Sequence, residues 1–182
     1  MEEDHDSALV ERCRNGDRAA FTELVVHYQR PIYNAAYRVL GNAEDASDIA
    51  QIVFLKVAER LDEYDPQYRF FSWIYRIAIN ESLNLLRRGA REEPLDEDDE
   101  RADAESAGPE SRASAAELSR RVQRALMSMR GDDRAVLTLR HFSDCSYSEI
   151  GEILELGEKT VKSRLFEARQ RLRALLKDLM PA

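Results

Sequence analysis

The feature that most constrains the fold is an acidic segment, residues 89–116, in the middle of the chain. It has almost no large apolar side chains and carries 10 acidic residues against 3 basic ones. Because such a composition cannot offset the entropy of ordering by burying apolar surface, we predict a flexible linker here. We therefore expect two small folded units, residues 1–88 and 117–182, on either side of it.

Both flanking segments show the pattern of helices. Apolar residues recur at steps of three and four, no alternating strand pattern occurs, and the 182 residues include only 7 Gly and 5 Pro. The predicted fold class is all-α, with two small helical domains joined by the acidic linker. Capping signals place helices at about 7–14, 17–29, 31–40, 45–61, 70–88, 116–129, 132–142, 146–155 and 158–178. Pro31 is expected to begin a new helix, since proline suits the first helical turn.

The charge of the chain is unevenly distributed. The net charge is −8, but residues 117–182 carry 13 basic and 10 acidic residues. Within residues 159–177 there are seven basic residues and one acidic residue, Glu167. Because local charge decides whether a surface can lie on phosphates, an acidic protein can still bind nucleic acid there.

Residues 146–178 have the features of a DNA-binding helix-turn-helix. Ser146 and Glu149 form a capping box, and Leu156-Gly157 is expected to supply the tight turn. On the polar side of the second helix, Lys162, Ser163 and Phe166 suit base edges in the major groove. Arg164, Arg169 and Arg171 suit phosphates, which position a protein without specifying sequence. The predicted duplex-binding residues are Lys159, Thr160, Lys162, Ser163, Arg164, Phe166 and Arg169. The alternative is an ordinary amphipathic helix with a solvated basic side.

A second candidate surface lies before the linker. Six of the 14 aromatic residues fall between Tyr64 and Tyr75, and an asparagine- and arginine-bearing helix follows. Aromatic rings stack on unpaired bases, asparagine reads base edges and arginine holds phosphate, so this surface suits single-stranded DNA. Its predicted residues are Tyr64, Tyr68, Phe70, Trp73, Tyr75, Arg76, Asn80, Asn84 and Arg87. The alternative is that the aromatic rings only form core and the asparagines are solvated.

Two sets of motifs then indicate a family. Residues 45–56 and 71–80 resemble conserved region 2 of the bacterial extracytoplasmic-function (ECF, group IV) sigma factors of the sigma-70 family. Residues 137–140, 146–150 and 157–164 resemble region 4 of the same family, in the same order along the chain. The matches depart from the family at Ile52, where an acid usually follows Gln51, at Met127-Ser128, where a Leu-Pro pair is common, and at Glu167, where a base is frequent.

The resemblance implies an alternative sigma factor with two DNA-binding domains. The first would dock on the β′ clamp helices of core RNA polymerase and capture the melted minus-10 strand. The second would bind the β-flap and read the minus-35 element of promoter DNA. The loop Asp62–Arg69 matches the one that would hold a flipped-out base. Residues that match the polymerase-docking helix are Asp45, Asp48, Gln51, Phe54 and Lys56. The family is commonly held inactive by an anti-sigma factor, so we expect one here.

Other classes of protein fit less well. A stand-alone helix-turn-helix regulator that dimerises through its first half remains the alternative binding module. An enzyme is not expected, because no catalytic, phosphate-loop or metal-ligand spacing occurs. We expect no cofactor, no metal, no small-molecule substrate and no membrane insertion, and a cytoplasmic location, since neither a signal peptide nor a membrane-spanning run is evident. Cys13 and Cys145 are expected to be ordinary apolar residues, with a redox role for Cys145 as the lesser alternative.

Overall fold

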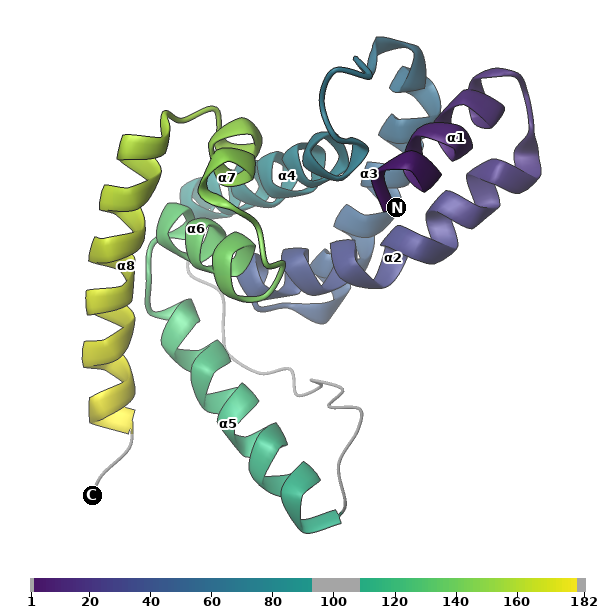
Figure 1. The fold of residues 1–182 in the computed structure, drawn as a ribbon. Helices are drawn as coiled ribbons and strands as arrows, with labels where there is room; N and C mark the ends of the chain where they lie inside the picture. Colours follow the sequence, from purple (N-terminus) through teal and green to yellow (C-terminus); the bar gives the residue numbers. More distant parts are fainter. Residues whose placement is uncertain (1, 93–108, 180–182) are drawn as a thin grey trace.

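The computed structural model describes residues 2–92 and 109–179, and all regular structure among them is helical, which confirms the all-α class (Figure 1). The first group of helices comprises α1 (Glu2–Arg14), α2 (Arg18–Leu40), α3 (Ala43–Arg60), the short 3-10 helix η1 (Leu61–Glu63) and α4 (Phe70–Glu92). The second group comprises α5 (Pro109–Met127), α6 (Gly131–His141), α7 (Tyr147–Leu154) and α8 (Glu158–Leu179).

The ends of two helices extend into the segment that we predicted to be a linker. Helix α4 continues to Glu92 and α5 begins at Pro109, so residues 89–92 and 109–116 are helical. The prediction of flexibility for residues 93–108 lies outside the described residues.

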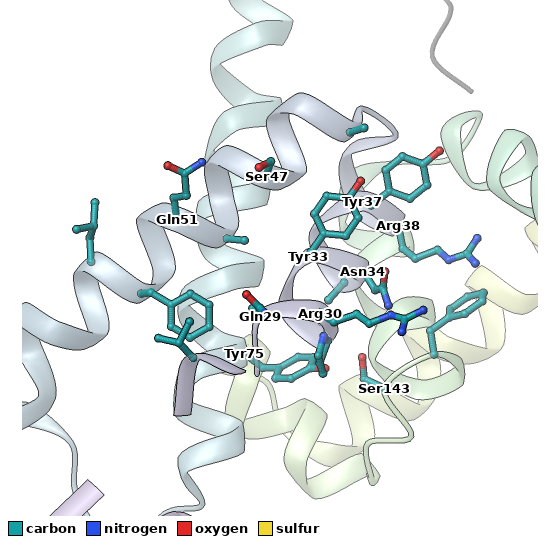
Figure 2. A pocket seen from close by; sticks show the side chains of 18 of the residues that line it. Gln29, Arg30, Tyr33, Asn34, Tyr37, Arg38, Ser47, Gln51, Tyr75 and Ser143 are labelled. Atoms are coloured by element: carbon teal, nitrogen blue, oxygen red, sulfur yellow. The ribbon is translucent and has the colours of Figure 1, made fainter. Parts of the chain in front are cut away.

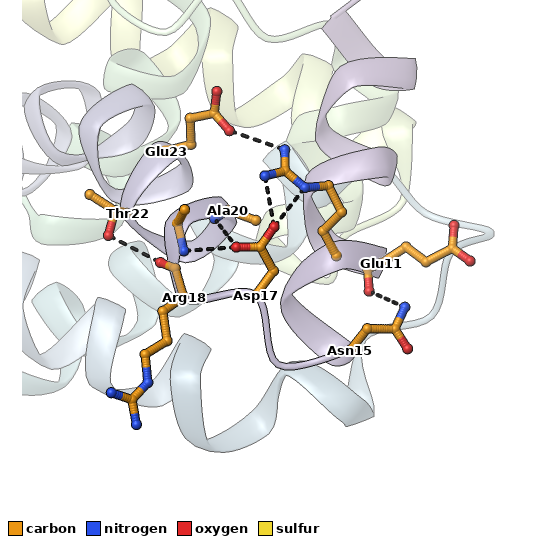
Figure 3. A network of polar contacts seen from close by, with 9 residues as sticks. Glu11, Asn15, Asp17, Arg18, Ala20, Thr22 and Glu23 are labelled. Carbon is orange, nitrogen blue, oxygen red and sulfur yellow. Dashed lines mark hydrogen bonds and ion pairs between the residues drawn. The ribbon is translucent and has the colours of Figure 1, made fainter.

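The turn between α1 and α2 shows how local sequence begins a helix. The Asp17 carboxylate accepts hydrogen bonds from the backbone N–H groups of Ala19 and Ala20, at 2.9 and 3.2 Å (Figure 3). It therefore satisfies backbone donors that have no partner within the helix, which confirms the predicted cap. Arg12 on α1 pairs with the same carboxylate at 2.7 Å, and this interaction holds the pKa of Asp17 below its usual value.

Helix α2 is continuous over 23 residues, so the prediction that a new helix starts at Pro31 is wrong. Pro31 lacks the N–H that would bond to the carbonyl of His27, a loss that costs about 3 kcal/mol in a helix interior. The apolar side of α2 nevertheless runs through this point, with Leu24 and Ile32 fully buried on either side of it. Each such side chain contributes about 1.5–3 kcal/mol by burial, so packing of the whole side outweighs the missing hydrogen bond.

The two groups of helices pack against each other. Helix α7 lies along α4, while α5 and α6 lie against α2 (Figure 1). At the end of α2, Gly41 has a φ of +81°, and a Cβ at this position would lie 2.1 Å from Sδ of Met127 on α5. Arg134 on α6 donates to the carbonyl of Val39 at 2.7 Å, across 95 positions of sequence. The two halves thus share one apolar core in this conformation.

Candidate nucleic-acid interface

Helices α7 and α8 form the predicted helix-turn-helix, and its capping box is confirmed. The backbone N–H of Glu149 donates to Oγ of Ser146 at 3.2 Å, and the N–H of Ser146 donates to Oε2 of Glu149 at 2.7 Å. This reciprocal pair fixes the residue at which α7 begins.

The turn between α7 and α8 does not depend on Gly157, so that part of the prediction is wrong. The left-handed residue is Glu155, with a φ of +55°, and open space surrounds the position of a Cβ at Gly157. The glycine that the turn requires is Gly151, where a Cβ would lie 2.7 Å from the carbonyl oxygen of Leu156. The chain folds back so closely over α7 that only a residue without a side chain fits there.

Helix α8 has one buried side and one exposed side, as its periodicity predicts. Val161, Leu165 and Ala168 are buried. The predicted duplex-binding residues that are exposed are Lys159, Thr160, Lys162, Ser163, Phe166 and Arg169, and Arg164 is half-buried. Phe166 has 64% of its surface exposed, so its ring adds little to the core and is accessible to a ligand.

Contacts within α7 and α8 orient the polar members of this surface. Nζ of Lys162 lies 3.6 Å from Oε2 of Glu158 and 5.7 Å from the centroid of the Tyr147 ring on α7. Oγ of Ser163 donates to the carbonyl of Lys159 at 3.2 Å, so its oxygen can still accept a hydrogen bond from a base. Lys162 and Ser163 therefore present one donor group and one acceptor group to the solvent.

Two arginines of α8 also bind within the domain. Arg171 pairs with Asp133 on α6 at 2.5 Å and with Glu167 at 3.2 Å. The sequence analysis had predicted that Arg171 contacts a DNA phosphate. Nε of Arg169 donates to Nε2 of His141 at 3.1 Å. Burial and nearby arginines lower the pKa of His141, which favours the neutral ring that can accept this bond. Arg171 thus connects α8 to α6 and also pairs with Glu167 on its own helix.

The second predicted surface follows one side of α4. Asn80 and Arg87 are exposed, and Trp73, Arg76 and Asn84 are half-buried. Nη1 of Arg87 donates to Oδ1 of Asn84 at 3.2 Å, which leaves the amide nitrogen of Asn84 available as a donor. These five residues are called the asparagine face below.

The aromatic residues before α4 divide into buried and exposed members. Tyr64 and Phe70 are buried, and with Trp73 they form a cluster whose ring centroids lie 5.5–5.7 Å apart. Tyr75 is also buried and stacks on Phe71, with 4.3 Å between centroids. Tyr68 is 55% exposed. In this conformation Tyr68 and part of Trp73 are accessible for base stacking, while the Tyr64 hydroxyl supports the loop by donating to the carbonyl of Tyr68 at 2.7 Å.

Arg14 is a loop-supporting residue that the sequence analysis did not identify. Its Nη2 donates to the carbonyl of Leu61 at 2.9 Å and also to that of Tyr64. The guanidinium carbon lies 5.7 Å from the centroid of the Tyr64 ring. Helix α1 thereby supports the loop that leads into α4. Because the two partners are about 50 positions apart in the sequence, no local pattern predicts this contact.

The predicted polymerase-docking residues lie on α3. Asp48 and Gln51 are exposed, and Asp45 and Phe54 are half-buried. Nζ of Lys56 lies 2.6 Å from Oε1 of Glu81, so Lys56 joins α3 to α4 in this structure.

A groove of about 1230 Å³ runs beside these residues (Figure 2). Gln51 and Phe54 of α3 and Tyr33 of α2 are among the residues that line it. Phe142 and Ser143, from the loop after α6, line the end of the groove nearest the second group of helices. Exposed Leu55 adjoins Phe54 on α3, so the groove offers both apolar and polar contacts.

Cys145 is not available for redox chemistry in the folded protein. It is 1% exposed, and burial raises the pKa of its thiol to about 12. The thiol therefore remains protonated at pH 7–8, where only a thiolate reacts. We expect iodoacetamide at pH 7.5 to modify Cys13, which is half-buried, at least tenfold faster than Cys145, and mass spectrometry of the peptides measures both rates. In denaturant the two rates are expected to converge, and rapid modification of Cys145 in the native chain would contradict this assignment.

Within residues 2–92 and 109–179, no group of three or more His, Cys, Asp and Glu side chains could hold a metal ion. None of the described helices combines the length and apolar character needed to cross a membrane.

Two family models match the chain. A model described as Sigma-70 region 2 matches residues 24–92, and one described as Sigma-70, region 4 matches residues 119–172. The first contains α3, α4 and the asparagine face, and the second contains α7 and most of α8.

Several known proteins are similar to almost the whole chain. The ECF RNA polymerase sigma factor SigW of Bacillus subtilis is 32% identical and covers 93% of this chain and 96% of its own length. The ECF RNA polymerase sigma-E factor of Escherichia coli is 36% identical and covers 91% of each chain. The solved structure of CnrH in complex with the cytosolic domain of CnrY has a TM-score of 0.73 and 26% identity, over 96% of this chain and 98% of that one.

Proposed function

Because this chain belongs to the extracytoplasmic-function sigma factors of the sigma-70 family, we propose that it directs core RNA polymerase to a specific set of promoters. One observation supports the proposal: the chain presents two surfaces with groups suited to DNA, in the order of the two family regions. The asparagine face on α4 has groups suited to unpaired bases, and α8 has groups suited to duplex DNA.

The division of roles follows from the chemistry of the two surfaces. On α8, Lys162, Ser163 and Phe166 would read the minus-35 element in the major groove. On α4, Asn80 and Asn84 would bind bases of the melted minus-10 strand, with Tyr68 and Trp73 stacking against them. Sigma factors do not catalyse the polymerisation themselves, and this chain would supply promoter selection and strand capture to the polymerase. We place this work in the bacterial cytoplasm, with residues 1–88 and 117–182 as the functional domains.

Two protein partners are part of the proposal. The exposed side of α3, with Asp48 and Gln51, would dock on core polymerase. The similar protein CnrH is solved in complex with the cytosolic domain of CnrY. CnrH and this chain share a fold over nearly their full lengths. We propose that an anti-sigma factor likewise controls this chain, and that the groove beside Gln51 and Phe54 is a contact for one of these partners.

Run-off transcription with purified core polymerase tests the proposed function. Candidate promoters come from sequencing genomic DNA that the chain retains when it is bound to core polymerase. We expect transcripts of defined length only when both core polymerase and this chain are present. Core polymerase alone is the control, and a chain that neither binds core polymerase nor yields any promoter-directed transcript would refute the proposal.

A stand-alone regulator would give a different result in the same set of assays. It would bind palindromic duplex DNA as a dimer without polymerase, and native mass would show two chains per complex.

A further inference from the structure

Helix α1 lies beside the loop that joins η1 to α4 (Figure 1). It ends before residue 24, where the match to the Sigma-70 region 2 model begins, so that match assigns α1 no role. One side chain of α1 nevertheless reaches the loop. Nη2 of Arg14 donates to the carbonyl of Leu61 at 2.9 Å and also to the carbonyl of Tyr64, and its Nε donates to the same Leu61 oxygen at 3.3 Å.

The two carbonyls that Arg14 binds stand at the start and at the end of η1. The Leu61 oxygen already accepts the backbone N–H of Tyr64 at 3.2 Å, as expected in a 3-10 turn. A guanidinium carries several N–H donors in one rigid plane, so it can bind both carbonyls at once in a fixed geometry. Arg14 therefore determines where η1 ends and in which direction the chain continues into the loop.

Tyr64 transmits this constraint along the loop. Its buried ring lies with its centroid 5.7 Å from the guanidinium carbon of Arg14, and its hydroxyl donates to the carbonyl of Tyr68 at 2.7 Å. Within the loop, the N–H of Gln67 donates to Oδ1 of Asp65 at 2.9 Å, and the N–H of Tyr68 donates to the carbonyl of Asp65 at 3.1 Å. A continuous series of contacts thus connects α1 to the residue that presents an exposed ring.

Helix α1 is itself held on α2 at two places. Near its start, the Tyr28 hydroxyl donates to Oδ2 of Asp6, and both residues are buried. Near its end, Nη1 of Arg12 lies 3.3 Å from Oε2 of Glu23. Because α1 is attached to the rest of the domain in this way, Arg14 reaches the loop from a rigid support.

The loop exposes groups that could hold a single unpaired base. The side chains of Asp65, Gln67 and Tyr68 are all exposed. A carboxylate and an amide can bind the edge of a base, and an aromatic ring can stack on its face. Such groups discriminate between bases only when they are held in place, because a loop that moves adapts to the wrong base.

We propose that Arg14 is a positioning residue for minus-10 recognition, which holds residues 62–69 in the conformation that selects the flipped-out base. This inference rests on the proposed function, since it assumes that the loop holds a base of the melted strand. The guanidinium of Arg14 is occupied by the two carbonyls, so it acts through the loop and not by contact with DNA.

Three variants separate positioning from charge. Arg14→Gln removes the guanidinium and its charge, whereas Arg14→Lys keeps the charge but replaces the planar set of donors with one ammonium. Arg14 is exposed, so neither change leaves an internal cavity. Arg18→Gln is the matched control, because Arg18 is an exposed arginine in the first turn of α2 and its loss changes the net charge by the same amount.

Hydrogen–deuterium exchange of the free, full-length chain measures the order of the loop without DNA. Mass spectrometry of peptides that cover residues 62–69 is expected to show amide exchange about tenfold faster in Arg14→Gln and in Arg14→Lys, since hydrogen bonds from a charged group are lost. Exchange of the loop in Arg18→Gln is expected to match the wild type. The amides of α2 are expected to exchange at the wild-type rate in all three variants.

Base discrimination by the holoenzyme is the second readout. The probe is a fluorescein-labelled fork-junction DNA with a single-stranded minus-10 element, taken from the promoters found by sequencing. All four bases are compared at the position where the wild type discriminates most. The ratio of the Kd for the worst base to that for the best base is expected to fall about tenfold in both Arg14 variants and to be unchanged in Arg18→Gln.

Several outcomes would overturn the proposal. A merely structural role would weaken binding of all four bases equally and leave the ratio unchanged. Wild-type discrimination in Arg14→Lys would show that only the charge matters, and lost discrimination without faster loop exchange would show direct contact with DNA. A wild-type holoenzyme that discriminates at no minus-10 position would refute the function proposed for the loop and this inference with it. The exchange rates would then still show whether Arg14 orders the loop, so the two failures are distinguishable.

Discussion

A chain in which Asn80 and Asn84 are both alanine is expected to open promoter DNA about 100-fold more slowly than the wild type. The two amides lie one helical turn apart on α4, Asn80 exposed and Asn84 half-buried. A base-edge contact from an asparagine contributes about 1–3 kcal/mol, and each 1.4 kcal/mol is a factor of about ten. Because neither side chain is part of the buried core, the loss is expected in strand capture and not in folding.

Permanganate reactivity of unpaired thymines in the minus-10 element measures this opening with holoenzyme. Binding of the same holoenzyme to duplex minus-35 DNA is expected to remain unchanged, since α8 is not altered. Asn15→Ala is the matched control, because Asn15 is an exposed asparagine outside α4 whose side-chain amide donates to the carbonyl of Glu11. A double variant that opens promoters at the rate of the Asn15→Ala chain would show that the asparagine face does not bind the strand.

Loss of Phe166 and Lys162 together is expected to weaken holoenzyme binding to minus-35 duplex DNA by about 100-fold. Each base-edge or methyl contact that is lost costs about 1–3 kcal/mol, and the two lie one turn apart on α8. Phe166 is 64% exposed, so its removal leaves no internal cavity to destabilise the domain. The thermal midpoint of unfolding should therefore remain close to that of the wild type.

Fluorescence anisotropy with a labelled duplex measures this affinity. All chains are compared at the same salt concentration, because salt weakens contacts between basic side chains and phosphates. Lys177→Ala is the control for charge, since Lys177 is an exposed lysine of α8 near its far end. Its loss is expected to weaken binding by less than about threefold. If the double variant and Lys177→Ala weaken binding equally, the predicted surface of α8 does not read the minus-35 element.

Much of the local structure could be predicted from the sequence, because its causes lie within a few residues. The Asp17 cap, the capping box of Ser146 and Glu149, and the two sides of α8 all depend on spacings of three or four positions. The path of α2 through Pro31 could not be predicted in this way. A local rule starts a helix at proline, but burial against α3 and α4 keeps the helix continuous.

The candidate site likewise has features that the sequence predicts and features that it does not. Its residue types and their helical faces are visible in the sequence, but the burial of Tyr64, Phe70 and Tyr75 is not. A small helical domain needs large rings to fill its core, and the sequence pattern alone cannot say which rings of a cluster serve that purpose. The need for a glycine at position 151 likewise depends on the tertiary structure, because the carbonyl of Leu156 lies where a Cβ would be.

The sequence by itself therefore determined the all-α class, the family and two surfaces suited to DNA, since these follow from periodicity, capping and motif spacing. Only the tertiary structure decided how the surfaces lie relative to each other. The pairing of Arg69 with Glu149 joins residues 80 positions apart, and no local pattern encodes such a contact. Packing of α7 on α4 brings together the charges of Arg69 and Glu149 and of Arg76 and Glu155, which are far apart in the sequence.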